Sequence, residues 1–390
     1  FSAHGGSGAV WGSKNIKAIA VTGTKKIKVA NPEEFYKLAK KEAHRLKNTT
    51  RPIELEYQKY GTLLLYDLLT TFVGYGADHR YLTPEETKNL VCANLFEKYC
   101  VGYHSCGSNC LENCTYLWEV LVGPYAGTRT CAIRFGSTDY MTLGMGNCNS
   151  NSMVKFHSLC NQYGLCGKMM PTALSFALEL YERGILTKED TGGIEIKAGD
   201  HATIIELTHL TAFREGFGNL LAEGPLNMAR MIKDAYPYRH GMYGRTYTVA
   251  LSNITGNRGT DHLATFGASK MSLEEKTRIY DILIKSIPSL TPATEPGVKG
   301  KGAWIAWEED GKAVIDSIGR CISGGVRGGI QILADIDKDP IGEERARLLS
   351  VLTGKDFSAK EILKCGERIF NLERAFNIRQ GAGNDIEILP

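Results

Sequence analysis

The 390-residue chain has no long hydrophobic run, and this lack excludes two classes of protein. No stretch approaches the ~18–20 apolar residues that a membrane-spanning helix needs. Residues 1–30 mix glycine, serine and lysine and contain no apolar core of the kind that a secretory signal peptide needs. The sequence therefore predicts a cytoplasmic protein without a membrane span.

Charge of one sign is also scarce. The formal net charge is only +3, and no tract of five or more basic residues occurs, so the sequence predicts no nucleic-acid partner. Internal repeats and low-complexity linkers are absent too. With 43% hydrophobic and 23% charged residues, the composition is that of an ordinary globular protein, and the length suffices for two or three domains.

Cysteine, in contrast, is plentiful, and three of the 11 cysteines fall within nine residues: Cys106, Cys110 and Cys114. The odd total and the reducing compartment argue against disulfides. Thiolates this close can turn toward one metal centre, and Cys321 is the candidate for the fourth ligand of an iron–sulfur cluster. Structural zinc is the alternative, although zinc sites usually carry two tight Cys/His pairs and only His104 lies near the trio.

Two turns share a polar-x-x-Gly-x-Cys pattern, at residues 161–166 and 316–321. The repetition predicts a ligand-binding site with two similar halves. Two unrelated helix ends are the alternative, because they would produce the same sequence pattern. A glycine-rich run at 5–14 is typical of a turn whose backbone approaches a phosphate. The polar loop 253–262 contains His262, which in such surroundings is a candidate general acid or base.

Periodicity and capping residues predict a helix-dominated body. Alternating β-branched residues predict strands within 14–29, around Gly23, and further strands within 185–199 and 243–252. Helices are expected at 61–73, 171–183, 200–215, 220–235 and 358–376, and a further helix is expected to begin after Asn31. Asn31 and Asp200 are the predicted N-caps, with Glu34 closing a capping box at the first, and Ser358 and Glu361 form a second capping box. Glycine is expected to end 171–183, at Gly184, and 200–215.

Together these segments resemble the aldehyde ferredoxin oxidoreductase family of tungsten-pterin enzymes along almost the whole chain. Residues 8–19 are similar to the family's Gly-Ala-Val-x-Gly-Ser-Lys-Asn-Leu-Lys-Ala-Ile segment. The cysteine trio and Cys321 fall on the family's cluster cysteines, with one residue more than usual between Cys106 and Cys110. Residues 161–166 fall on a pterin motif that normally reads Asp-x-x-Gly-Leu-Asp, and 372–381 are similar to a segment near the family's C-terminus.

The resemblance implies two cofactors and the residues that hold them. A [4Fe–4S] cluster would be bound by Cys106, Cys110, Cys114 and Cys321, and a tungsten bis-pterin would lie nearby, with a magnesium ion bridging the pterins. Its other implied cofactor-binding residues are Gly8, Ser13, Lys14, Asn161, Gly164, Leu165, Cys166, Asn257, Arg258, Asp316, Gly319 and Arg320. His262 falls on the family's active-site histidine, where it would supply a proton or hydrogen-bond a pterin.

One departure from the family pattern shifts the predicted activity. Where aldehyde oxidoreductases read Tyr-Glu-Gly-Pro-Glu-Tyr-Glu-Thr, residues 125–132 read Tyr-Ala-Gly-Thr-Arg-Thr-Cys-Ala, so Cys131 replaces the carboxylate that approaches the substrate. A soft thiolate prefers to bind the metal directly, and protein-ligated tungsten is typical of the catalytic subunit of class II benzoyl-CoA reductase. A buried inert thiol is the alternative interpretation of Cys131.

The resemblance therefore implies low-potential reduction of the ring of an aromatic acyl-CoA to a cyclic dienoyl-CoA, a reaction of anaerobic aromatic degradation. Electrons would come from an iron–sulfur subunit or a ferredoxin. An aldehyde ferredoxin oxidoreductase that oxidises aldehydes to carboxylic acids is the first alternative, and a non-catalytic zinc module is the second.

The implied fold is mainly α with some β, built from two largely helical domains after an N-terminal β-rich pterin-binding domain. We expect residues 1–30 to be the tail of that first domain, 31–236 the helical second domain with the cysteine trio, and 237–390 a truncated third. Because the chain opens on Phe1 and closes just after a glycine turn, we expect a fragment of a longer protein. We also expect that protein to be an oligomer.

Overall fold

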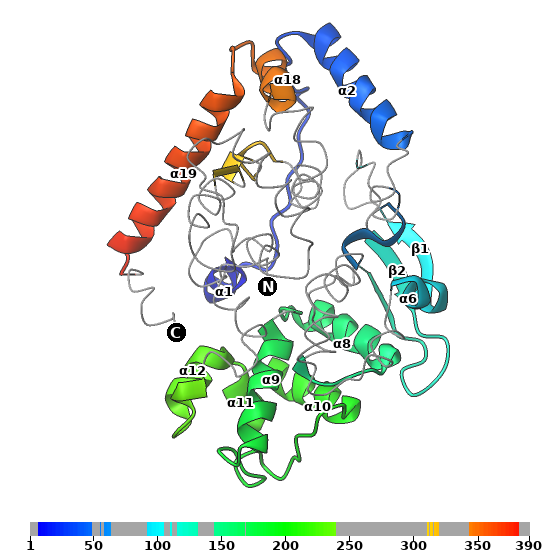
Figure 1. Cartoon of the computed structure of the whole chain (residues 1–390), viewed down its shortest axis with the longest axis vertical. Coiled ribbons are helices and arrows are strands. Elements are labelled where there is room, and N and C mark those ends of the chain that lie inside the picture. Colours follow the sequence, from blue (N-terminus) through cyan, green and yellow to red (C-terminus); the bar gives the residue numbers. More distant parts are fainter. Residues whose placement is uncertain are drawn as a thin grey trace, which may run out of the picture. The chain divides into compact units, whose positions relative to one another are not determined.

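The structure is a computed structural model, and helices predominate in the parts that it describes (Figure 1). The described residues are 7–48, 55, 58–63, 92–104, 110, 115–131, 144–167, 169–238, 310–311, 313–314, 316–319 and 343–381. Their one sheet is small, which confirms the predicted class of mainly α with some β. No helix among these residues has the length and apolarity needed to cross a membrane.

The chain divides into two compact units. The first unit comprises Phe1–Lys17, Arg51–Ser252 and Pro390, and the second comprises Ala18–Thr50 and Asn253–Leu389. Residues 31–50 thus group with the second unit, and the predicted domain boundaries at 30/31 and 236/237 stay predictions.

The sheet of the first unit has three antiparallel strands in the order β1-β2-β3: β1 (Cys100–His104), β2 (Thr115–Glu119) and β3 (Arg129–Cys131). Side chains on β2 alternate, so that Tyr116 and Trp118 are buried while Leu117 is exposed. The buried face packs on α6 (Cys92–Tyr99), whose Phe96 ring meets Tyr116 edge-on at 4.4 Å between centroids. The sequence analysis did not predict these strands.

Five helices form most of the remaining described core of the first unit: α8 (Ser150–Tyr163), α9 (Met169–Glu182), α10 (His201–Phe213), α11 (Phe217–Leu221) and α12 (Gly224–Met231). Every residue of α9 from Met170 to Leu180 is buried, as expected for a helix that is apolar all round. Gly184 follows at φ +71°, which confirms the predicted glycine end.

Asp200 caps α10 as predicted. Its carboxylate accepts hydrogen bonds from the backbone N–H groups of Ala202 and Thr203 and from the Thr203 hydroxyl. Burial alone raises the pKa of the Asp200 carboxyl, but the three hydrogen bonds outweigh burial and hold the pKa below its ordinary value.

Replacing Asp200 by Ala is expected to lower the free energy of unfolding by about 1 kcal/mol, the usual value of an N-cap. Because the folded-state pKa is depressed, the stabilisation is fully present above the unfolded pKa of about 3.9 and is lost as the pH falls through the folded value. Urea unfolding at pH 7 and near pH 3 checks this: the difference between parent and variant should shrink at the lower pH, and a constant difference would contradict the charged cap.

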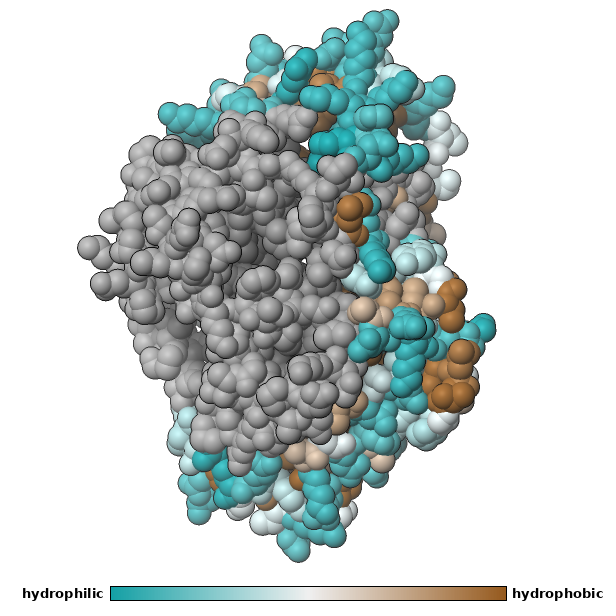
Figure 2. Space-filling view, turned by 45° about the vertical axis from the view of Figure 1, so that its right-hand side comes forward, coloured by the Kyte–Doolittle hydropathy of each residue, from teal (hydrophilic) through white to brown (hydrophobic). Residues whose placement is uncertain are grey.

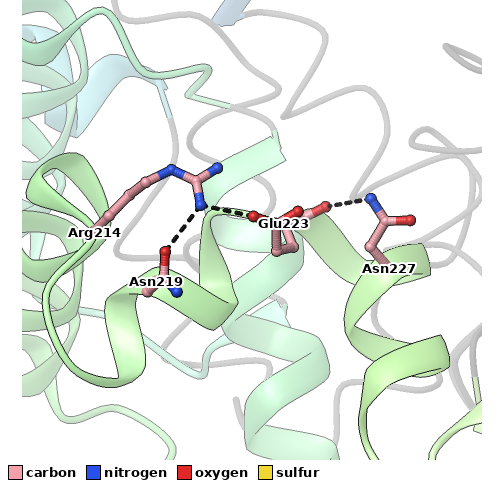
Figure 3. A network of polar contacts seen from close by, with 4 residues as sticks. All are labelled: Arg214, Asn219, Glu223 and Asn227. Carbon is pink, nitrogen blue, oxygen red and sulfur yellow. Dashed lines mark hydrogen bonds and ion pairs between the residues drawn. The ribbon is translucent and has the colours of Figure 1, made fainter.

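The end of α10 and the next two helices differ from the prediction. The helix ends at Phe213, and the left-handed position is occupied by Arg214 (φ 56°) rather than by glycine. The Arg214 guanidinium donates to Asn219 at 2.9 Å and to Glu223 at 2.7 Å. Figure 3 shows these contacts together with that of Asn227, which donates to the Glu223 carbonyl. The helix predicted over 220–235 is broken between α11 and α12, where Gly224 has φ +77°.

In the second unit, α2 (Pro32–Lys47) packs on α18 (Glu343–Thr353), and α19 (Ala359–Arg379) follows. Asn31 caps α2 by accepting from the Glu34 N–H, as predicted, but the Glu34 carboxylate pairs with Arg347 instead of closing a capping box. The predicted capping box of α19 is confirmed, because Glu361 accepts from both the N–H and the hydroxyl of Ser358.

Two predicted strand regions are wrong. Residues 14–29 form no strand, although their β-branched residues alternate, and no described strand pairs with them. Residues 185–199 instead form turns, in which Asp190 accepts from Thr187 and the consecutive Gly192 and Gly193 have positive φ. Of the helix predicted over 61–73 only the 3₁₀ turn η1 (Gly61–Leu63) is described, and 243–252 lie outside the described residues.

Candidate functional site

The cysteine trio lies in the connection between the first two strands of the sheet. Residues 105–114 join β1 to β2, and the ends of this connection, His104 and Thr115, are paired across the ladder. Cys110 is half-buried; Cys106 and Cys114, like Cys321, lie outside the described residues. Within the described part of the chain no three His, Cys, Asp or Glu side chains gather in a metal-binding group, so the cluster ligands stay predictions.

Cys131 lies toward that same end of the sheet. Because β3 runs antiparallel to β2, its last residue, Cys131, is opposite Leu117, whereas Arg129 is opposite Glu119. Leu117 is two residues from Thr115, which corresponds to about 7 Å along the strand. The sheet therefore brings the predicted tungsten ligand toward the connection that holds the predicted cluster ligands.

The Cys131 side chain is exposed and forms no disulfide, so the alternative interpretation of a buried thiol is wrong. Its cross-strand neighbour Leu117 is 44% exposed and lies beside Gly102. Figure 2 shows such exposed hydrophobic surface (brown) among the described residues at the right of the view. The chain does contain a buried thiol, Cys160, whose pKa is raised by burial and by the neighbouring Cys166.

Side chains of α8 hold the strand that carries Cys131. The Ser158 hydroxyl donates to the Arg129 carbonyl at 3.1 Å. The Asn161 amide nitrogen donates to the Thr130 hydroxyl at 3.0 Å and to the Cys131 carbonyl at 3.4 Å. The structure thus brings together two residues that the sequence analysis placed at the cofactor for separate reasons, Asn161 and Cys131.

The turn before β3 is held from two sides. The Tyr125 hydroxyl lies 2.8 Å from Nδ1 of His201, and burial, followed by the charge of Asp200, raises the Tyr125 pKa. Asn151 of α8 donates to the Val122 carbonyl at 3.0 Å. These contacts fix where β3 begins, and the sequence carried no motif that pointed to them.

Both polar-x-x-Gly-x-Cys patterns are helix ends. Gly164 ends α8 with φ 68°, and its N–H and that of Leu165 reach the Cys160 carbonyl. Gly319 has φ 70° after the helical residues 316–317, and its N–H reaches the Asp316 carbonyl at 3.2 Å. The shared glycine therefore has a local cause, since only glycine takes this left-handed position without strain.

The remaining predicted cofactor residues divide into two groups. Gly8 and Ser13 lie in the short helix α1 (Ser7–Ser13), where the Ser13 hydroxyl donates to the Val10 carbonyl at 2.8 Å, and Lys14 follows directly. The run at 5–14 is therefore helical over Ser7–Ser13 and not the predicted turn. Asn257, Arg258, His262 and Arg320 lie outside the described residues.

Comparison with known proteins decides the family. Residues 37–390 match the family model described as "Aldehyde ferredoxin oxidoreductase, domains 2 & 3". The chain belongs to the aldehyde ferredoxin oxidoreductase family. This confirms the resemblance drawn from the sequence motifs.

The relatives of this family member are considerably longer than the chain. The tungsten-containing aldehyde ferredoxin oxidoreductase of Pyrococcus horikoshii is 27% identical over 401 residues, and the match covers 97% of this chain and 59% of that protein. The aliphatic sulfonate oxidoreductase, WOR-like subunit, of Pyrococcus furiosus is 30% identical over 292 residues, covering 67% of this chain and 44% of the relative. The chain thus spans less than two thirds of either relative.

The same fold occurs in the solved active-site complex BamBC of benzoyl coenzyme A reductase with 1,5-dienoyl-CoA. The match has a TM-score of 0.66 at 21% identity and covers 97% of this chain and 61% of the solved one. At this level of identity the likeness establishes the shared fold alone.

The described residues offer donors that suit the tungsten-pterin group implied by the names of the tungsten-containing relatives. Cys131 offers an exposed soft sulfur donor of the kind that suits a thiophilic metal. Asn161, on the adjacent helix end, offers an amide that already contacts the Cys131 backbone. The donor atoms that the described residues offer near Cys131 are therefore of the kind that such a group binds.

Proposed function

We propose that this chain is part of a tungsten-pterin, iron–sulfur oxidoreductase that reduces the ring of an aromatic acyl-CoA to a cyclic dienoyl-CoA. One observation supports this most directly: an exposed thiol, Cys131, lies at the end of the sheet from which the cysteine-rich connection emerges. A soft ligand there suits direct metal binding, whereas a carboxylate would suit contact with an aldehyde substrate.

Each proposed residue has a distinct task. Cys106, Cys110, Cys114 and Cys321 hold the [4Fe–4S] cluster, which receives electrons from an iron–sulfur subunit or a ferredoxin. Cys131 would ligate the tungsten, and the tungsten bis-pterin, when bound, would supply low-potential electrons for the ring. His262 holds a proton for the substrate or a hydrogen bond to a pterin. The other proposed cofactor contacts are Gly8, Ser13, Lys14, Asn161, Gly164, Leu165, Cys166, Asn257, Arg258, Asp316, Gly319 and Arg320.

Aldehyde oxidation is the second candidate, and the sequence relatives favour it. The tungsten-containing relatives that match nearly the whole chain are aldehyde ferredoxin oxidoreductases. Under this alternative the tungsten would carry only pterin sulfur and oxygen ligands, and the Cys131 thiol would face the substrate without binding metal.

X-ray absorption at the tungsten edge of the anaerobically purified full-length protein, together with its total iron, separates the candidates. We expect about four iron atoms per tungsten and a sulfur shell one atom richer than two dithiolenes supply. A shell of only pterin sulfur and oxygen would favour aldehyde oxidation. Zinc without iron would indicate the non-catalytic module, and iron without tungsten would overturn both enzymatic proposals.

A further inference from the structure

The outer edge of β3 is closed by side chains of α8. Among the described strands β3 pairs only with β2, and an edge strand presents unpaired carbonyls on its other side. The carbonyls of Arg129 and Cys131, which are two residues apart, accept hydrogen bonds from Ser158 and Asn161. Alternate carbonyls of a strand point to the same side, so both belong to the outer edge.

The spacing on the helix matches the spacing on the strand. Ser158 and Asn161 are three residues apart and therefore share one face of α8, about 4.5 Å apart along its axis. The Cys131 carbonyl can only accept a hydrogen bond, so the Asn161 amide must turn its nitrogen toward the strand. The same nitrogen also reaches the Thr130 hydroxyl, which gives Asn161 two contacts on consecutive residues of β3.

We propose that Asn161 is a positioning residue for the Cys131 thiol, an inference that rests on the proposed tungsten ligation by Cys131. By holding the Thr130 side chain and the Cys131 carbonyl, its amide fixes the last residue of a three-residue strand that would otherwise fray. Its Oδ1 has no partner among the described residues, so the side chain retains an acceptor for a bound pterin.

Two variants of Asn161 and one control variant test the role of its side-chain amide. Asn161→Asp keeps the shape and removes the donor, while Asn161→Gln keeps an amide on a longer stem. Asn227→Asp is the matched control, since Asn227 also donates to a backbone carbonyl, that of Glu223, at 3.3 Å on another helix of the unit. Hydrogen–deuterium exchange of the peptide that spans β3, in the metal-free full-length protein, is the first readout.

We expect Asn161→Asp to speed amide exchange in β3 roughly fivefold, as expected for the loss of about one net hydrogen bond. Asn161→Gln should restore at least half of the protection, and Asn227→Asp should leave β3 unchanged. Exchange in Asn161→Asp within twofold of the parent would overturn the proposal, as would an equal effect of the control.

The second readout is the tungsten-edge sulfur shell of the loaded protein, which a purely structural role would not change. We expect Asn161→Asp to lengthen or weaken the protein-sulfur contribution while total iron stays constant. An unaltered sulfur shell beside faster exchange would mean that Asn161 holds the strand but does not position the thiol. If Cys131→Ser also leaves the shell unaltered, the proposed ligation itself fails, whatever the exchange result.

Discussion

Under the proposed function, replacing Cys131 by Ser is expected to abolish aryl-CoA reduction while tungsten and iron contents remain near those of the parent. A hydroxyl is a harder and poorer ligand than a thiolate for a sulfur-ligated metal. The loss should exceed about 100-fold, because changes in mere outer-shell partners already cost up to that factor. Since the side chain is exposed, its replacement removes no core packing, and the fold should be kept.

The measurement is activity with a reduced electron donor and an aromatic acyl-CoA, beside metal analysis and the iron–sulfur spectrum. Cys148→Ser is the matched control, since Cys148 is another exposed cysteine of the same unit and should tolerate the change. Full activity of the Cys131 variant would rule out ligation by this thiol. Loss of iron in that variant would instead point to Cys131 as a cluster ligand.

Local signals in the sequence predicted helix ends well. Asp200 accepts hydrogen bonds from residues two and three positions later, and Ser358 and Glu361 bond to each other across three positions. Both partners of each interaction therefore lie within one short sequence motif. The end of α10 escaped prediction because Arg214 takes the left-handed position normally reserved for glycine, held there by its contacts with Asn219 and Glu223.

The sequence did not predict the sheet, because strands pair with residues that can lie far away in the sequence. Residues 16–29 have the alternation of strands yet form none, whereas β2 pairs with a three-residue strand that no periodicity can reveal. A run such as Thr115-Tyr-Leu-Trp has suitable residues, but only its contact with Phe96 decides which face is buried.

In the candidate site, too, the residues with a sequence motif could be predicted and their contacts with one another could not. Cys131 and Asn161 were predicted from a resemblance, each by its own motif, and their mutual contact across 30 residues could not be read from either. The supporting contacts join residues even farther apart in sequence: Tyr125 meets His201 across 76 residues. Such partners have no fixed offset, so only the folded chain identifies them.

Replacing Gly218 by Ala is expected to disrupt the packing of α11 on α10. A Cβ at this position would lie 2.2 Å from the Leu210 carbonyl carbon and 2.5 Å from the Thr211 nitrogen, both backbone atoms that cannot rotate away. The flanking Phe217 and Leu221 are buried, so the short helix cannot shift without exposing them. We expect a cost of about 3 kcal/mol, at the upper end for overpacking.

The effect should extend toward the candidate site, because α10 is bonded to the elements that hold β3. His209 of α10 lies 2.7 Å from the Tyr163 hydroxyl at the end of α8, and His201 holds Tyr125. Urea unfolding and amide exchange over 201–221 test this, with Gly311→Ala as the control, since a Cβ there meets nothing within 4 Å. A neutral Gly218 variant would show that α10 and α11 can separate enough to admit a Cβ without loss of stability, and would contradict this prediction.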